Sequence, residues 1–177
     1  MTGIPGMRGV EHVGFSVPDI EQAITFFVDV VGCEYVYDMG PFEDPEGTWM
    51  SDNLNIHRSA TIARIAFLRC ANGANFELFQ FSAPDQVMDW PKMSDFGGHH
   101  IAFQVHDMDA AIEYLHSRGV TVLGGKKAGD GPAEEQGSFY AHFLTPWGQL
   151  LELVSYPSSR ARSSTGHPLW TVPATNS

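Results

Sequence analysis

The sequence is poor in basic residues. Its 177 residues include ten Lys and Arg against twenty-one Asp and Glu, which gives a formal net charge of −11. A surface this acidic repels nucleic-acid phosphates and anionic lipid headgroups. We therefore expect no nucleic acid and no membrane as a partner. The composition leaves small-molecule chemistry open, because a local basic group can still hold an anion.

Long apolar runs and a cysteine framework are also missing. No segment reaches the roughly 18 consecutive apolar residues of a membrane-spanning helix, and residues 1–10 lack the apolar stretch of a secretory signal. The two cysteines, Cys33 and Cys70, are too few for a disulfide-stapled fold, so we expect buried free thiols. These features predict a cytoplasmic protein.

Two blocks of the sequence occur twice. Residues 12–24 align with residues 100–112 at an offset of 88 residues, and the histidine that opens each block is identical. Farther along, Phe-Glu-Leu at 76–78 aligns with Leu-Glu-Leu at 151–153 at an offset of 75 residues. Because the blocks occur in the same order, the chain contains two copies of one structural unit.

Each copy has the pattern of one strand, one helix and three further strands. The first strand alternates in polarity, and an aspartate, Asp19 or Asp107, then precedes a stretch with helical apolar spacing that a glycine ends. The predicted strands cover residues 10–17, 34–37, 61–69, 75–81, 99–105, 120–123, 139–144 and 150–155. This order predicts an α+β fold of two tandem βαβββ modules.

The modules have expected boundaries. Residues 1–82 form the N-terminal module, 83–97 a linker rich in Pro, Asp and Gly, and 98–157 the C-terminal module; residues 158–177 form a tail. Two long loops, 38–60 and 124–137, remain within the modules. Loops of this length often serve as lids or binding walls.

Four residues at repeat-equivalent positions carry the candidate chemistry. His12 and His100 lie on first strands, and Glu77 and Glu152 lie on last strands. Taken singly, a strand His is usually a hydrogen-bonded core residue and a strand Glu usually faces solvent. The shared repeat positions favour instead one divalent ion (Zn, Ni, Fe, Mn or Co) held by imidazole nitrogens and carboxylate oxygens. His142 has no partner in the repeat, so we expect no ligand role for it.

The turn at Asn72-Gly73 predicts the strand register. A two-residue hairpin loop at this site places Glu77 opposite Leu68. Arg64, four residues before Leu68, then shares the cavity face with Glu77. We expect Arg64 to bind a substrate carboxylate, to form an ion pair with Glu77, or to be exposed at the surface.

Apolar and aromatic side chains are expected to surround the substrate. Trp49, His57 and Arg58 lie in the long first loop. Phe139 and Phe143 alternate along the seventh strand and are expected on its cavity face. We interpret all five as candidate substrate-binding residues for an apolar or aromatic small molecule.

Three segments, 11–19, 97–107 and 145–154, resemble the vicinal oxygen chelate superfamily. This superfamily includes glyoxalase I, methylmalonyl-CoA epimerase, extradiol dioxygenases and the fosfomycin and bleomycin resistance proteins. The resemblance implies a half-open mixed β-barrel with a metal ion in its mouth, and a homodimer. By position, the metal ligands that it implies are His12, Glu77, His100 and Glu152.

These features predict a divalent-metal-dependent lyase or isomerase, similar to glyoxalase or an epimerase. A small substrate would chelate the ion and react through an enediolate, with Glu77 as base and Glu152 returning the proton on the other face. One alternative is an Fe(II) extradiol-type dioxygenase whose ligands are His12, His100 and Glu152. The other is a non-catalytic small-molecule-binding protein of the resistance type.

Overall fold

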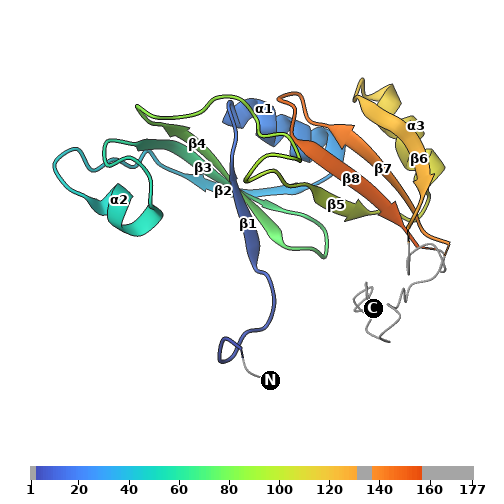
Figure 1. Cartoon of the computed structure of the whole chain (residues 1–177), viewed down its shortest axis with the longest axis horizontal. Helices are drawn as coiled ribbons and strands as arrows, with labels where there is room; N and C mark the ends of the chain where they lie inside the picture. Colours follow the sequence, from blue (N-terminus) through green and yellow to red (C-terminus); the bar gives the residue numbers. More distant parts are fainter. Residues whose placement is uncertain (1–2, 131–136, 157–177) are drawn as a thin grey trace. The chain divides into compact units, whose positions relative to one another are not determined.

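The chain divides into two units, one ending at Met88 and the other beginning at Asp89. The computed structural model describes residues 3–130 and 137–156, so the predicted tail at 158–177 lies outside the described residues. In Figure 1 the first unit contains β1 (His12–Ser16), α1 (Ile20–Thr25), the π-helix η1 (Phe26–Val31), β2 (Glu34–Met39), α2 (Trp49–Leu54), β3 (Thr61–Arg69) and β4 (Asn75–Ser82). The second contains β5 (Ile101–Gln104), α3 (Met108–Ser117), β6 (Val122–Ala128), β7 (Phe139–Leu144) and β8 (Leu150–Ser155).

Each unit forms one four-stranded mixed sheet. The strand orders are β1-β4-β3-β2 and β5-β8-β7-β6. In both sheets the first and last strands of the module pair in parallel, and the remaining neighbours pair antiparallel. The predicted α+β class with two tandem βαβββ modules is confirmed.

α1 and α3 begin at the two predicted aspartates. Asp19 Oδ1 accepts a hydrogen bond from the Gln22 N–H at 3.1 Å, and Asp107 Oδ1 accepts one from the Ala110 N–H at 3.0 Å. These contacts satisfy backbone donors that the first turn of a helix leaves free. Among the described residues, no helix is long and apolar enough to cross a membrane.

The core of each unit lies between its helix and one face of its sheet. In the first unit Ala23, Phe27, Leu68 and Leu78 are fully buried there. In the second unit α3 packs on β6, β7 and β8, and the core includes the buried residues Leu115, Phe143 and Leu151. The opposite face carries Glu77 together with the apolar Ile65 and Phe67 in the first unit, and His142 and Glu152 in the second.

The two predicted long loops contain more regular structure than expected. The 38–60 segment includes α2, which lies off one end of the first sheet (Figure 1). Its Met50 is 1% exposed and packs with Ile62 and Ile65 of β3, so tertiary burial stabilises a helix too short to be evident from periodicity. β6 extends through Ala128, so the 124–137 segment begins as a strand; residues 131–136 lie outside the described part.

The two cysteines are free thiols, as predicted. Cys33 is buried and Cys70 is half-buried, with their Sγ atoms 2.7 Å apart. The hydrogen bond to Cys33, together with burial, raises the pKa of the Cys70 thiol. This shift favours the neutral, less reactive form of Cys70.

The predicted register between β3 and β4 is wrong by one residue. Glu77 lies opposite Phe67, and Leu68 lies opposite Phe76. The strands are joined by residues 70–74 rather than by a two-residue loop, and Ala71 adopts a left-handed φ of 46°. A one-residue change of register moves every side chain of a strand to the other face. Leu68 therefore points into the core.

This register predicts different costs for two neighbouring substitutions. We expect Leu68→Ala to lower the free energy of unfolding by about 2–5 kcal/mol, because it leaves a cavity in the core. Phe67→Leu, on the other face, should cost less than about 1.5 kcal/mol. Guanidinium titrations followed by circular dichroism measure both values. A larger cost for Phe67→Leu than for Leu68→Ala would contradict the register.

Candidate functional site

The N-terminal module places His12 and Glu77 side by side. β1 and β4 pair with Gly14 opposite Glu77, so His12 lies two residues away on the same face. His12 Nε2 is 3.3 Å from Glu77 Oε2. The Glu77 side chain is 18% exposed, and its burial raises the pKa of the carboxyl, while the nearby His12 acts in the opposite direction.

A second carboxylate orients the His12 ring. Glu11 Oε2 lies 2.5 Å from His12 Nδ1, and Glu11 Oε1 accepts a hydrogen bond from Asn75 Nδ2 at 2.8 Å. The hydrogen bond to His12 is the main reason that the pKa of Glu11 lies below its usual value. A carboxylate at Nδ1 leaves Nε2 directed toward Glu77, an arrangement typical of metal-binding histidines.

The missing side chain of Gly14 makes room for the glutamate. A Cβ at Gly14 would lie 3.2 Å from Phe79 Cε2 and 3.4 Å from Glu77 Oε2. The first distance is tighter than ordinary van der Waals contact, so a larger residue would displace its neighbours. In the C-terminal module the residue opposite Glu152 is Ala102, which is also small. Both first strands thus allow a carboxylate to lie over them.

The C-terminal module brings three possible metal ligands together. His100 immediately precedes β5, Glu152 lies on β8, and His142 lies on β7 directly opposite Glu152. His100 Nε2 is 2.8 Å from Glu152 Oε2. One donor atom from each of the three residues lies within 4.8 Å of the other two. His142, for which the sequence predicted no role, is therefore part of this group.

The two faces of β7 are the reverse of those predicted. His142 shares the face of Glu152, so Phe139 and Phe143 point to the other side of the sheet. Phe143 is 2% exposed in the core, and Phe139 lies beneath Lys126, whose Nζ is 5.1 Å from the ring centre. The prediction that these phenylalanines lie on the cavity face is wrong. The 75-residue offset aligns His142 with Phe67. This alignment was the feature of the sequence that could have placed His142 on the same face as the glutamate.

Arg64 lies on the helix-facing side of its sheet rather than with Glu77. It pairs in the ladder with Gln80, whose side chain accepts a hydrogen bond from the first residue of α1. Its guanidinium forms ion pairs with Glu21 and Asp38. The expected ion pair with Glu77 is therefore wrong, because Arg64 lies on the other face of the sheet and pairs with Glu21 and Asp38 instead.

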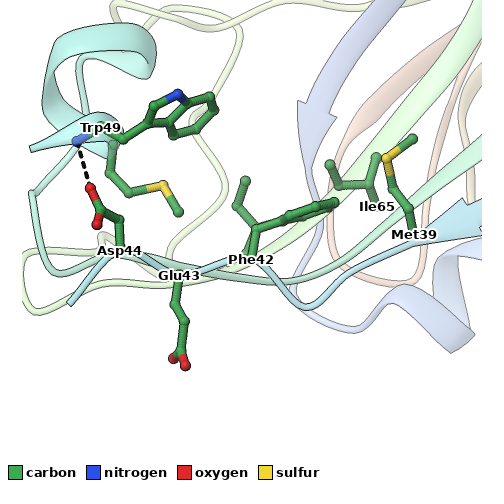
Figure 2. Close-up of a pocket in the computed structure, with 8 residues that line it drawn as sticks. Met39, Phe42, Glu43, Asp44, Trp49 and Ile65 are labelled. Carbon is green, nitrogen blue, oxygen red and sulfur yellow. Dashed lines mark hydrogen bonds between the residues drawn. The ribbon is translucent and has the colours of Figure 1, made fainter. Parts of the chain in front are cut away.

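An apolar pocket of about 530 Å³ lies within the N-terminal module (Figure 2). Ile65, in its wall, is opposite Phe79 and thus on the Glu77 face of the sheet. Asp44 Oδ2 accepts a hydrogen bond from the Trp49 N–H at 2.9 Å, which fixes the start of α2. In Figure 2 the carboxylate of Glu43 points away from the apolar side chains. The lining residues are Met39, Phe42, Glu43, Asp44, Trp49, Met50, Ile62 and Ile65.

Of the predicted loop residues, Trp49 lines this pocket, whereas His57 and Arg58 are not among its lining residues. His57 Nδ1 accepts a hydrogen bond from the Ser59 N–H at 3.1 Å. Arg58 Nη2 donates to the Gly47 carbonyl at 3.3 Å. Both side chains make local contacts within the 38–60 segment.

The sequence matches known proteins over most of its length. A model of the glyoxalase/bleomycin resistance protein/dioxygenase superfamily matches residues 11–140. A 2-epi-5-epi-valiolone epimerase from an Actinomyces species is 46% identical over 158 residues, covering 88% of this chain and 84% of that protein.

Solved structures share the fold at lower identity. A glyoxalase family protein from Bacillus cereus has a TM-score of 0.65 and 19% identity, over 88% of this chain and 100% of that one. The trypanothione-dependent glyoxalase I of Leishmania major has a TM-score of 0.53 and 19% identity, over 84% of this chain and 87% of that one. At these identities the two structures bear on the fold alone.

The raised pKa of Glu77 predicts a pH-dependent effect of Glu77→Gln in protein stripped of metal by a chelator. The reference value is 4.5, and the folded protein binds the proton more tightly. The stability that this group contributes is therefore complete below pH 4.5 and is lost as the pH rises through the folded pKa. We expect Glu77→Gln to gain stability relative to the wild type over that range and then level off.

Urea titrations at several pH values measure this difference. Glu113→Gln, at an exposed position on α3, is the matched control and should show no such rise. A relative gain of the Glu77→Gln variant on acidification instead would contradict the assigned burial of Glu77.

Proposed function

Because the chain belongs to the glyoxalase/bleomycin resistance protein/dioxygenase superfamily, we propose that it is an isomerase that epimerises a carbon next to a ketone carbonyl. The first candidate substrate is 2-epi-5-epi-valiolone, which gives the Actinomyces relative its name. One observation carries the proposal: in each module a glutamate lies beside a histidine, and the two pairs occupy equivalent positions in their sheets. Epimerisation needs two such groups, one for each face of the carbon.

The donors of both pairs fit a divalent ion. Neighbouring ligands about 2.1 Å from an ion lie about 3 Å apart, and His100 Nε2 and Glu152 Oε2 are 2.8 Å apart. We propose that His12, Glu77, His100 and Glu152 together hold one Zn, Ni, Fe, Mn or Co ion per chain. Such an ion, when bound, polarises the substrate carbonyl as a Lewis acid.

Glu77 is assigned as the base. Its burial raises the pKa of its carboxyl, so it takes up a proton more readily than an exposed glutamate does. A Glu77 carboxylate oxygen removes the hydrogen next to the carbonyl, and Glu152 delivers a proton to the opposite face. The carbon loses one proton and gains one, so the reaction requires no oxidant or reductant.

We propose the apolar pocket as the wall that receives the unreactive side of the substrate. It lies on the Glu77 face of the sheet and includes Trp49, which is 51% exposed and thus available for contact. His57 and Arg58 would act from the same segment as polar groups that close over a bound molecule. We also propose that the protein is cytoplasmic and that it forms a homodimer.

One observation favours a second function. His100, His142 and Glu152 form a set of two histidines and one carboxylate, the donor set of many non-haem Fe(II) oxygenases. An extradiol-type dioxygenase consumes O₂, whereas an epimerase does not. An oxygen electrode with Fe(II)-loaded protein and catechol substrates separates the two functions.

Substitution of either glutamate should strongly slow epimerisation. We expect Glu77→Gln and Glu152→Gln each to slow it by about 10²–10⁴-fold, the usual contribution of a positioned proton-transfer group. In D₂O, Glu152→Gln should still exchange the substrate hydrogen that Glu77 removes, while Glu77→Gln should lose both exchange and epimerisation. Proton NMR of 2-epi-5-epi-valiolone follows both processes.

Glu113→Gln again serves as the control and should keep the wild-type rate. Wild-type rates in both glutamate variants would refute the assigned roles. Absence of exchange and epimerisation in the metal-loaded wild type, with tight binding of the ketone, would indicate a non-catalytic binding protein instead.

A further inference from the structure

We propose that His142 is an additional ligand of the metal ion, so that the C-terminal module supplies three donors and Glu77 is free to act as a base. This inference rests on the proposed function, because it concerns the same metal site. Its starting point is a difference between the two modules at one position of the repeat.

The difference lies on the strand next to each glutamate. In the N-terminal module Phe67 of β3 is opposite Glu77, and in the C-terminal module His142 of β7 is opposite Glu152. Both pairs follow the same 75-residue offset. The C-terminal module therefore has an imidazole ring, with nitrogen donors, where the N-terminal module has a phenyl ring. Each ring lies on the same face of its sheet as the glutamate.

The spacing of the C-terminal donors is close to that around an ion. Ligand atoms about 2.1 Å from an ion lie about 3 Å apart when adjacent and at most about 4.2 Å apart when opposite. His100 and Glu152 already have the adjacent spacing, at 2.8 Å. The full set of three lies within 4.8 Å, and the half-buried His142 side chain would have to move closer to the other two donors to reach ligand spacing.

The ring nitrogens of His142 are available. Its contacts are edge-on, with the His100 ring at 5.8 Å and the Tyr140 ring at 5.5 Å between centroids. Within residues 3–130 and 137–156 neither nitrogen has a hydrogen-bond partner. A half-buried imidazole without such a partner gains more from a metal bond than one already committed to a carbonyl.

The N-terminal module offers fewer side chains that could bind a metal ion. The Phe67 ring lies edge-on to His12 at 5.7 Å and stacks on Tyr37 at 4.9 Å, so it provides packing and no donor. His12 and Glu77 remain as a pair, 3.3 Å apart. With three donors within the C-terminal module, ion binding would not depend on Glu77. The two copies of the repeat thus differ in the number of donor atoms that they offer to an ion.

Metal affinity tests this division without relying on activity. The full chain is titrated with Zn²⁺ against a chromophoric chelator, and with Co²⁺ while its visible absorption bands are recorded. We expect His142→Phe to weaken binding by at least about 10–100-fold, the loss seen even for residues that only support a ligand, and to change the Co²⁺ bands. Glu77→Gln should weaken binding by only a few-fold.

Two further variants serve as controls. His142→Gln removes the ring without adding apolar bulk and should reproduce the loss, and His116→Phe, on the exposed side of α3, should bind like the wild type. Folded His142→Phe and His142→Gln proteins with wild-type affinity and unchanged Co²⁺ bands would overturn the inference. That result would leave the roles of Glu77 and Glu152 standing, because hydrogen exchange tests them separately.

Discussion

The parallel pairing between the first and last strand of each module is the constraint on which the rest of the structure depends. It sets Gly14 opposite Glu77 and Ala102 opposite Glu152, so each carboxylate lies over a small residue. The helix covers the opposite face of each sheet and takes up the apolar side chains. A glutamate in an apolar strand thereby stays outside the core, next to the histidine that precedes or begins the first strand.

The internal repeat made much of this predictable. Paired blocks gave the two modules, and Asp19 and Asp107 marked helix starts because their side chains satisfy free backbone donors. The registers were not predictable from turn composition. Asn72-Gly73 suggested a two-residue loop, but Ala71 adopts a left-handed conformation and the connection covers residues 70–74. This one-residue change reversed the faces assigned to β3.

The site residues followed the same pattern. Side chains that the repeat identified, such as His100 and Glu152, are neighbours in their module. Arg64 and Phe143, which strand alternation predicted on the cavity faces, lie on the opposite faces of their sheets. α2 was missed because burial of Met50, a tertiary contact, stabilises it. Local spacing thus gave the elements, whereas faces and loop structure required long-range packing.

The two modules share one plan but differ in chemistry. The N-terminal half has a glutamate whose pKa is raised by burial, an apolar pocket and a phenylalanine beside the glutamate. The C-terminal half has three donors within 4.8 Å. Duplication supplies the paired carboxylates that the proposed epimerisation needs, and the difference between Phe67 and His142 gives the C-terminal module a third donor side chain.

Metal stoichiometry tests the central claim most directly. Protein purified without a tag or chelator, and then loaded separately with Zn, Ni, Fe, Mn and Co, is measured by mass spectrometry. The account predicts one tightly bound divalent ion per chain. No bound ion under any loading condition, or two ions per chain with one on each His–Glu pair, would contradict it.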